Sequence, residues 1–469
     1  MPINSFDNYP MSWIPNREKL LYPYYISLAE ELEKAIREGS LVENVMLPPQ
    51  RELADFLDLS HSTITKAYKL CEVKGLVYGK VGKGTFVASG IGSKTIKPEN
   101  STNIIQMGQA LPFYEHNDKI LQVTEKILRD RYASKLFEYA NPFGNLKQQE
   151  AAQTWMEQFG IDTEKGAIGI TSGSQNALVI TLMALFKPGD KIVTDTFTYP
   201  NFISLANMLN IQLITLRNDE HGMIPSELDS ICRNNKINGI YLMPSVANST
   251  NISMNLKRRI DISSLITTYG LILIEDDAYA FLAEEKIKPM AMLVPEQSIY
   301  INGIAKALSA GLRIAYMRFP ERYRQVIENA IYNINLKTPA LNLEIATEII
   351  RLDVSNELIL QKKQAAKERN KLFAVYFSDI VAPIKIFSHF QWLPLPEGCS
   401  GKVFEFICKE KGVNLYGSER FSAGDNYGIQ AVRIATSSPE SVSELVKGLE
   451  IVKEVYDSVQ SAVGTEFIL

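Results

Sequence analysis

The sequence predicts an α/β protein with a mostly parallel sheet, preceded by a small helical region. Beyond residue 104, short runs rich in Ile, Leu and Val alternate with longer segments of helical periodicity. Strands that are buried on both faces of a parallel sheet have this uninterrupted apolar composition. The expected strands are Ala167–Ile170, Ile192–Thr194, Gln212–Leu216, Gly239–Met243, Leu271–Ile274 and Ser298–Ile301.

The composition indicates a folded protein without cross-links. Of its 469 residues, 46% are hydrophobic and 22% are charged, so the chain can bury a sizeable core. Its net charge of −4 gives no sign that the chain as a whole binds nucleic acid. We expect no metal site and a cytoplasmic location, because the N-terminus does not resemble a leader and no apolar run reaches the roughly 18 residues of a membrane span. Four widely spaced cysteines favour a reducing compartment: Cys71, Cys232, Cys399 and Cys408.

The composition and the hydrophobic pattern of the sequence change once, which divides the chain into two domains. Residues 15–87 contain short helical patterns and a hairpin punctuated by glycines. Residues 88–103 are small and polar and have almost nothing to bury, which is typical of a linker. Residues 104–469 form the α/β part, and we expect a smaller C-terminal lobe from about residue 340 onward.

The N-terminal part has the pattern of a winged helix-turn-helix. Residues 51–57 form a short amphipathic helix after Leu47-Pro48-Pro49, residues 58–60 form a turn, and residues 61–74 form a second helix. Glycines then flank two short apolar segments over residues 75–87, as in a two-stranded wing. The second helix has one apolar stripe and an opposite face that is polar and basic, free to enter a major groove.

The charge of this part is locally basic. Residues 59–88 contain five lysines and one acidic residue, Glu72, for a net charge of +4. A basic face of this kind is what phosphate contacts require. The alternative is a surface helical hairpin with solvated lysines. The candidate DNA-binding residues are Arg51, His61, Ser62, Thr63, Thr65, Lys66, Lys69 and Lys83.

The segment LPPQRELADFLDLSHSTITKAYKLCEVKGLVYGKVGKGTFV, residues 47–87, resembles the GntR-type winged helix. The order and spacing of its punctuating residues match over some forty positions. One departure stands at His61, where the family usually has arginine, so the contact made there differs.

In the α/β part, polar side chains follow five of the expected strands. Ser174 and Gln175 lie in a turn of small residues that opens a helix, and Tyr199, Asn248 and Asp276 follow later strands. Such groups meet at the carboxyl edge of an open α/β sheet, which is where these sheets bind ligands. The last strand is followed by Lys306, with Arg313 seven residues further on, and Tyr279 lies three residues after Asp276.

These residue types fit one chemistry when taken together. A lysine amine condenses with an aldehyde, and a carboxylate keeps a pyridine nitrogen protonated. A tyrosine and an asparagine can hydrogen-bond a phenolate, an aromatic ring can stack, and an arginine can clamp a phosphate. Each residue alone is more commonly structural, so the prediction depends on the ordered set.

Residues from about 106 to 452 resemble a fold-type I, aspartate-aminotransferase-like domain that binds pyridoxal 5′-phosphate (PLP). With the N-terminal part, the whole chain resembles the MocR/GabR-type transcription regulators. The resemblance implies that Lys306 is the Schiff-base lysine and Asp276 the partner of the pyridine nitrogen. The other implied PLP contacts are Asn248 and Tyr279 to the ring oxygen, Tyr199 stacked on the ring, Ser174, Gln175 and Arg313 at the phosphate, and Tyr139 reaching the phosphate across a dimer.

A second implied site recognises the ligand. Arg433, in the segment AVRIAT, resembles the arginine that binds a substrate carboxylate. Three departures predict weaker cofactor binding than in an enzyme. Gly303 and Ala305 replace the serines that usually flank the lysine, Asn-Pro-Thr-Gly has become residues 248–251 (NSTN), and Leu-Arg has become Gln148-Gln149.

Three functional hypotheses follow. The leading one is a PLP-dependent DNA-binding regulator, in which a small amino acid or amine effector changes how the heads bind double-stranded DNA. The second is a working PLP-dependent aminotransferase that carries a DNA-binding head. The third is a regulator whose pocket no longer takes PLP. The resemblance also implies a homodimer, with domains swapped between its subunits.

Overall fold

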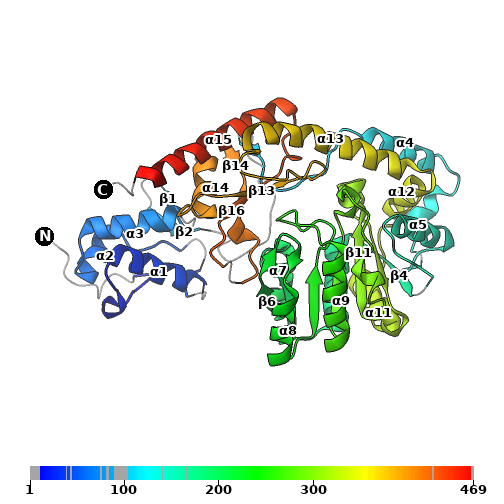
Figure 1. Ribbon diagram of the computed structural model, residues 1–469, viewed down its shortest axis with the longest axis horizontal. Coiled ribbons are helices and arrows are strands. Elements are labelled where there is room, and N and C mark those ends of the chain that lie inside the picture. Colours follow the sequence, from blue (N-terminus) through cyan, green and yellow to red (C-terminus); the bar gives the residue numbers. More distant parts are fainter. Residues whose placement is uncertain are drawn as a thin grey trace.

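A computed structural model describes residues 11–37, 40–42, 45–73, 76–80, 84–88, 104–139, 141–164, 166–424 and 427–465. Figure 1 shows a small N-terminal domain beside a larger body, in which a sheet lies among helices and long helices run along the top. Apart from Ala88, the expected linker over residues 88–103 lies outside the described residues.

The N-terminal domain has the helices and the hairpin that the sequence predicts. It has a core of its own, which includes Leu53, Ile64 and Tyr68. Its strands pair antiparallel, as in a wing. Its elements are η2 (Arg17–Lys19), α1 (Tyr24–Arg37), α2 (Gln50–Leu57), α3 (His61–Val73), β1 (Val77–Lys80) and β2 (Gly84–Val87).

The turn between α2 and α3 has a local cause. Asp58 ends α2 in the left-handed region, at φ 49°, which short polar side chains tolerate better than branched ones. The Ser60 hydroxyl then accepts a hydrogen bond from the Thr63 amide at 3.2 Å, which satisfies one of the free amides at the start of α3.

The large body is built on a seven-stranded sheet of order β4-β12-β11-β10-β9-β5-β6. All six expected strands are present. The neighbours from β11 through β10, β9 and β5 to β6 run parallel, which confirms the mostly parallel sheet. The strands are β4 (Ala167–Thr171), β5 (Lys191–Asp195), β6 (Gln212–Leu216), β9 (Gly239–Leu242), β10 (Ile272–Asp276), β11 (Ser298–Gly303) and β12 (Ala315–Phe319).

Strand β12 was not among the expected strands. It lies between β4 and β11 and is antiparallel to both. Its sequence contains Arg318, a charged residue that is typical of an exposed position. In the fold, however, this arginine is buried, and its guanidinium donates a hydrogen bond from Nη1 to the Pro295 carbonyl at 2.6 Å.

Helices connect these strands and cover the sheet (Figure 1). They are α6 (Ser174–Leu185), α7 (Pro200–Met208), α8 (Pro225–Asn234), α9 (Leu256–Tyr269), α10 (Ile304–Ala307) and α11 (Arg324–Asn335). The short elements are β7 (Asn218–Asp219), β8 (Gly222–Met223), η4 (Ala280–Leu282), η5 (Met290–Met292), η6 (Ala310–Leu312) and η7 (Glu321–Tyr323).

The chain enters the large body through α4 (Asn117–Leu128), η3 (Ala133–Phe137) and α5 (Leu146–Glu157), all of which contact α12 (Ala340–Arg351). The long helix α13 (Val354–Phe377) then leads to a second lobe with a separate core, which includes Phe373 and Leu449. This small lobe contains β13 (Gln391–Pro394), α14 (Gly401–Glu410), β14 (Val413–Asn414), β15 (Tyr416–Gly417), η8 (Ser418–Arg420), β16 (Ala431–Ile434) and α15 (Val442–Thr465).

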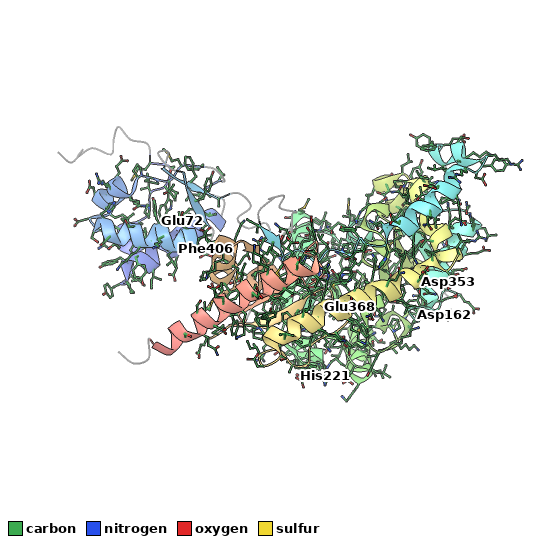
Figure 2. All side chains as sticks on the ribbon, turned by 90° about the horizontal axis from the view of Figure 1, so that it is seen from above. Glu72, Asp162, His221, Asp353, Glu368 and Phe406 are labelled. Atoms are coloured by element: carbon green, nitrogen blue, oxygen red, sulfur yellow. The ribbon has the colours of Figure 1, made fainter. Side chains whose placement is uncertain are left out.

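Two further contacts join segments from the N-terminal part of the chain to the small lobe. Strand β3 (Ile105–Gln106) pairs in parallel with β14, so the first residues after the linker join the small lobe. Helix α3 of the N-terminal domain contacts α14, and Figure 2 shows Glu72 and Phe406 close to each other there. In the part of the chain that is described, no helix is long and apolar enough to span a bilayer, and no cluster of side chains could hold a metal ion.

Candidate functional site

Lys306 lies one turn beyond the carboxyl end of β11. The strand ends at Gly303 and α10 begins at Ile304, so the half-buried lysine is held close to the sheet edge. Its Nζ donates a hydrogen bond to the Ala110 carbonyl. Burial, together with the charges of Arg433 and Arg313, lowers the pKa of Lys306 to about 7. The amine is therefore largely neutral just above neutrality, which is the form that attacks a carbonyl carbon.

Asp276 is the last residue of β10, beside β11 in the sheet. It is 2% exposed, and its Oδ2 accepts a hydrogen bond from the Tyr241 hydroxyl at 2.9 Å. Its Oδ1 is buried and has no hydrogen-bond partner among the described residues. Burial raises the pKa of Asp276 to about 6, although the Tyr241 hydroxyl opposes this shift. One carboxylate oxygen is thus left for a ligand.

The two neighbouring acids are used differently. Glu275 accepts hydrogen bonds from the backbone amides of Met290 and Ala291 at 3.1 and 2.6 Å. Asp277 accepts a bond from the Tyr300 hydroxyl at 3.0 Å, within the body of the protein. Both acids therefore have structural partners, which leaves Asp276 as the acid of this trio with an oxygen to offer.

Arg433 lies in the middle of β16, at the junction of the small lobe and the large body. It is 1% exposed, donates from Nη1 to Asn248 Oδ1 at 2.6 Å and from Nη2 to the Gly108 carbonyl at 2.6 Å. Its guanidinium carbon is 4.5 Å from the centre of the Phe421 ring and 5.2 Å from that of Phe390. Burial lowers the pKa of Arg433 to about 10, so it remains charged at neutral pH.

No acid within the described ranges forms an ion pair with Arg433, and its buried Nε has no hydrogen-bond partner there. Its bonds to protein go to a neutral amide and to a carbonyl. A buried cation without an anion is costly, and a bound carboxylate would remove that cost. The environment therefore favours a ligand clamp over a structural ion pair.

The start of α6 forms the next part of the site. Gly173 precedes the helix at φ 94°, and a Cβ there would lie 2.6 Å from Nη2 of Arg313. Arg313 itself adopts the left-handed region, at φ 53°. The guanidinium therefore lies directly against the turn whose free amides and helix dipole attract a phosphate.

Gly303 also contacts this turn. A Cβ at Gly303 would lie 2.1 Å from the Ser174 hydroxyl oxygen. The position that usually carries a serine in the resembled family therefore has another residue's hydroxyl beside it here. Ser174 occupies part of the space that a side chain at position 303 would fill.

Tyr199 and Gln175 meet beside this turn. The Tyr199 hydroxyl donates a hydrogen bond to Gln175 Oε1 at 3.1 Å. Burial, and then the charge of Asp276, raise the pKa of Tyr199 to about 12, so its hydroxyl stays protonated. Tyr279 is buried, and burial raises its pKa. The charges of Arg433 and Asp276 also act on the pKa of Tyr279, so this residue belongs to the same cluster.

Tyr139 is the exception among the expected cofactor residues. It is 90% exposed and is not brought to the site within this chain. Other large apolar side chains of the same region are exposed as well: Tyr132, Phe137 and Leu146.

The candidate DNA-binding residues form an exposed surface on α3 and the start of α2. Arg51, His61 and Lys69 are exposed, and the Thr65 hydroxyl donates to Gln50 Oε1 at 2.7 Å, which ties the two helices together. Ser62 and Lys66 are also exposed, Thr63 is half-buried, and Lys83 lies outside the described residues. The opposite stripe of α3 is buried, as predicted: Ile64, Ala67, Tyr68 and Cys71.

Comparison with known proteins identifies the family. The model of the family "Aminotransferase class I and II" matches residues 102–447, and that of "Bacterial regulatory proteins, gntR family" matches residues 25–87. The HTH-type transcriptional regulator YdeF of Bacillus subtilis is 36% identical over 461 residues, which are 98% of this chain and 100% of YdeF. The chain belongs to this family of GntR-type regulators with an aminotransferase domain.

Other relatives of the regulator agree with this assignment. The HTH-type transcriptional regulator YdcR of Escherichia coli is 20% identical over 86% of this chain and 93% of its own length. Kynurenine aminotransferase of Pyrococcus horikoshii superposes with a TM-score of 0.71 at 23% identity, over 76% of this chain and 92% of that one. LysN, the α-aminoadipate aminotransferase of Thermus thermophilus, gives a TM-score of 0.70 at 21% identity, over 80% and 98%. These structures confirm the aminotransferase fold.

The structure also explains how the regulator tolerates two of its departures from the family pattern. Asn251 stands where the pattern has glycine and adopts a left-handed φ of 64°, a conformation that asparagine takes more readily than most residues. Its side chain bonds the Phe390 carbonyl and accepts from the Ser388 hydroxyl at 2.7 Å, which joins the turn to the small lobe. Gln148 completes a capping box with Asn145 at the start of α5.

Several residues at the site were not expected from the sequence. Gly108 and Ala110 supply carbonyls to Arg433 and Lys306, and they come directly after the linker, where no motif marks them. Lys362 and His389 were also not expected: the charge of Lys362 helps to lower the pKa of Lys306, and burial and the charges of both lysines lower the pKa of His389. Histidine is rare in this chain, with four in all, but a single histidine carries no positional signal of its own.

Proposed function

We propose that this chain is a PLP-dependent transcription regulator that senses a small amino compound with a carboxylate. One observation carries the proposal. Lys306 and Asp276 lie at the carboxyl ends of two adjacent strands of the large sheet, and Arg433 reaches the large body from the small lobe through its bond to Asn248. Asp276 and Arg433 keep buried polar atoms without protein partners among the described residues. A DNA-binding head on the same chain favours a regulatory use of that site.

The residues fit the cofactor that the aminotransferase fold implies. Asp276 Oδ1 is free to accept a bond from a pyridinium nitrogen, and Lys306 has a lowered pKa. Arg313 lies against the turn that opens α6, which suits a phosphate. When bound, PLP supplies an aldehyde that reacts with primary amines and a ring that withdraws electrons.

Each residue of the site would make one kind of contact with PLP. Lys306 presents a neutral amine, and Asp276 holds the proton on the ring nitrogen. Tyr279 and Asn248 would bond the ring oxygen, and Tyr199 would stack on the ring. The phosphate would be held by Ser174, Gln175 and Arg313.

Arg433 would bind the carboxylate of the amino compound. Its planar fork can form two parallel hydrogen bonds with a carboxylate, which lysine cannot do. The two aromatic rings beside it exclude water and keep the guanidinium in place. A carboxylate that arrives here would be recognised from the small lobe, while the amino group is recognised from the large body.

Recognition of one ligand by both lobes suggests how ligand binding could affect DNA binding. The small lobe carries Arg433 on β16 and also carries α14, which contacts both β16 and the DNA-binding helix α3. A ligand that draws the small lobe toward the large body would move α14 relative to α3. Such a switch requires that the ligand bind the two arrangements with different affinity.

We further propose that the regulator is a cytoplasmic homodimer. The exposed side chains of Tyr132, Phe137, Tyr139 and Leu146 would then be covered, and Tyr139 would reach the phosphate in the partner subunit. The dimer would place two basic α3 helices on double-stranded DNA, in successive major grooves.

A working aminotransferase remains the second candidate, because the charged groups needed for amino-group chemistry, Lys306, Asp276 and Arg433, are all present. One experiment separates the two. The holoprotein is titrated with a panel of amines and amino acids while cofactor absorbance and retention of operator DNA are followed, and keto acid is then added to test for turnover. A ligand that changes the spectrum and DNA binding without turnover supports the regulator. Sustained turnover without any effect on DNA binding contradicts it.

A further inference from the structure

His389 is a buried histidine whose ring has no hydrogen-bond partner among the described residues. It lies just before β13, is 0% exposed, and neither ring nitrogen is bonded to any of the described residues. Three aromatic rings meet it edge-on, those of Phe113, Tyr279 and Phe281, at centroid distances of 5.1, 5.9 and 5.6 Å. A phenylalanine would suit these neighbours better, since an unsatisfied buried polar group destabilises the fold.

The position of His389 places it in the wall of the proposed ligand site. The next residue, Phe390, packs against both Tyr279, at 5.4 Å, and the Arg433 guanidinium, at 5.2 Å. Phe113 follows closely after Ala110, whose carbonyl receives the Lys306 hydrogen bond. His389 is thus linked to the site by its contact with the Tyr279 ring and by the charge of Lys306, which acts on its pKa.

The backbone on either side of His389 is held firmly. The His389 carbonyl accepts from the Ser437 amide at 3.1 Å, and the Ser388 carbonyl accepts from Asn370 Nδ2 at 2.6 Å. The ring cannot find a partner through a backbone shift without breaking these bonds. The two ring nitrogens therefore stay without a protein partner among the described residues.

Lys362 adds a second basic group on this side. It lies on α13, is 1% exposed, and donates from Nζ to the Leu308 carbonyl at 2.8 Å, at the end of the helix that carries Lys306. Burial lowers the pKa of Lys362 to about 8. No carboxylate of the described chain lies within ion-pair distance of it, and Glu115 acts on it only through its longer-range charge.

The charges of the site are unbalanced until a ligand is included. Burial, and then the charges of Lys306 and Lys362, hold the pKa of His389 well below its usual range. A bound phosphate would neutralise the charge of Arg313, and a carboxylate next to the amino group would neutralise that of Arg433. Lys362 would still lack an anion among the described residues, and the neutral ring of His389 would still lack a hydrogen-bond partner there.

We propose that the amino compound sensed by this protein is an acidic amino acid, whose side-chain carboxylate is bound by His389 and Lys362. The inference rests on the proposed sensor function and specifies its ligand. The second carboxylate would accept a hydrogen bond from His389 and neutralise the charge near Lys362. An uncharged side chain would leave both groups unsatisfied, so it would bind less well.

The test compares matched ligands on the holoprotein. Calorimetry gives Kd for L-aspartate, L-glutamate, their amides L-asparagine and L-glutamine, and L-norvaline, while absorbance reports the cofactor. We expect one of the two acids to bind at least about tenfold more tightly than its amide and than norvaline. His389→Phe and Lys362→Met should weaken the acid and leave the amide unchanged. Lys371→Met, at an exposed position of the same helix, should change neither.

The outcomes separate this inference from the sensor function itself. If amides and norvaline bind as tightly as the acids, the inference is wrong and the sensor stands. If His389→Phe keeps the full preference for the acid, His389 has no part in recognition and the inference is again wrong. If no amino compound binds or changes the absorbance, both proposals fail. The comparison of ligands on the unmodified protein decides the ligand class even where a variant loses its cofactor.

Discussion

Arg433 and Asn248 join the two lobes of the protein through a hydrogen bond of 2.6 Å between Nη1 and Oδ1. Arg433 comes from a strand of the small lobe, and Asn248 from the loop after a strand of the large sheet. Arg433, the proposed carboxylate clamp, is therefore hydrogen-bonded directly to Asn248, a proposed contact of the cofactor ring. A ligand that engages the guanidinium should therefore also act on Asn248, the side chain proposed to contact the ring.

This link sharpens the expected effect of substituting Arg433. Arg433→Lys keeps the charge but loses the fork and the bond geometry to Asn248, so the response to the amino compound should be abolished. Cofactor stoichiometry and basal DNA binding should be retained. Absorbance titration and a DNA-retention assay on the same preparation measure all three. An unchanged ligand response would show that the clamp is elsewhere.

Asp276→Asn should weaken cofactor binding far more than Asp277→Asn. Asp276 has a free buried oxygen, whereas Asp277 is occupied by the Tyr300 hydroxyl. A hydrogen bond to a charged group contributes about 1.5–3 kcal/mol, so the loss should be about ten- to a hundredfold in Kd. Titration of each apoprotein with PLP gives the values. Equal effects of the two substitutions would mean that the wrong acid has been assigned.

The sequence could place these residues because their signal is local. Lys306, Asp276 and Asn248 each follow an apolar run, and the carboxyl edge of a parallel sheet collects such residues whatever the details of packing. The helix-turn-helix could be predicted from the sequence for the same reason, since its apolar stripe and its turn at Asp58 lie within a few residues of each other. In these cases sequence distance and spatial distance agree.

The features that were missed depend on distant segments. Strand β12 contains Arg318, which is buried because a carbonyl of another loop receives its guanidinium. The surroundings of His389 come from two separate segments, one with Phe113 and one with Tyr279 and Phe281, and Lys362 bonds a carbonyl at the end of α10. No periodicity in the sequence reports such contacts, because each joins segments that come together only in the folded protein.

Capture of the cofactor should depend on pH through Lys306. Its pKa is lowered to about 7, mainly by burial. A lysine with a lowered pKa is protonated below that value and neutral above it, and the neutral amine is the reactive form. The rate at which apoprotein binds PLP covalently should therefore rise between about pH 6 and 8 and level off above.

Stopped-flow absorbance over that range measures this rate. N-acetyl-lysine provides the reference, since its rate should keep rising toward its ordinary pKa near 10.4. Lys306→Ala should give no covalent product after borohydride reduction and should keep a native melting transition. A profile for the protein that still rises above pH 9 would show that the surroundings do not lower the pKa of Lys306.

The DNA-binding surface makes the last prediction. Lys66 and Lys69 are exposed on α3, and the Nζ of Lys66 lies 5.9 Å from the centre of the Tyr25 ring, which leaves its charge available. Replacing either lysine with alanine should lower affinity for operator DNA. If each contacts one phosphate, the slope of log K against log salt should fall by about 0.9 per substitution. The same is expected for Lys83→Ala.

The salt dependence distinguishes a phosphate contact from other causes of weaker binding. Lys34→Ala removes an exposed lysine from α1, outside the helix-turn-helix, and should leave the slope unchanged. A loss of affinity with an unchanged slope at Lys66 or Lys69 would point to base recognition or to local unfolding, which circular dichroism would detect. A slope reduced equally by Lys34→Ala would mean that general charge, and not the α3 surface, attracts the DNA. Only a reduction confined to α3 and the wing agrees with a helix inserted in the major groove.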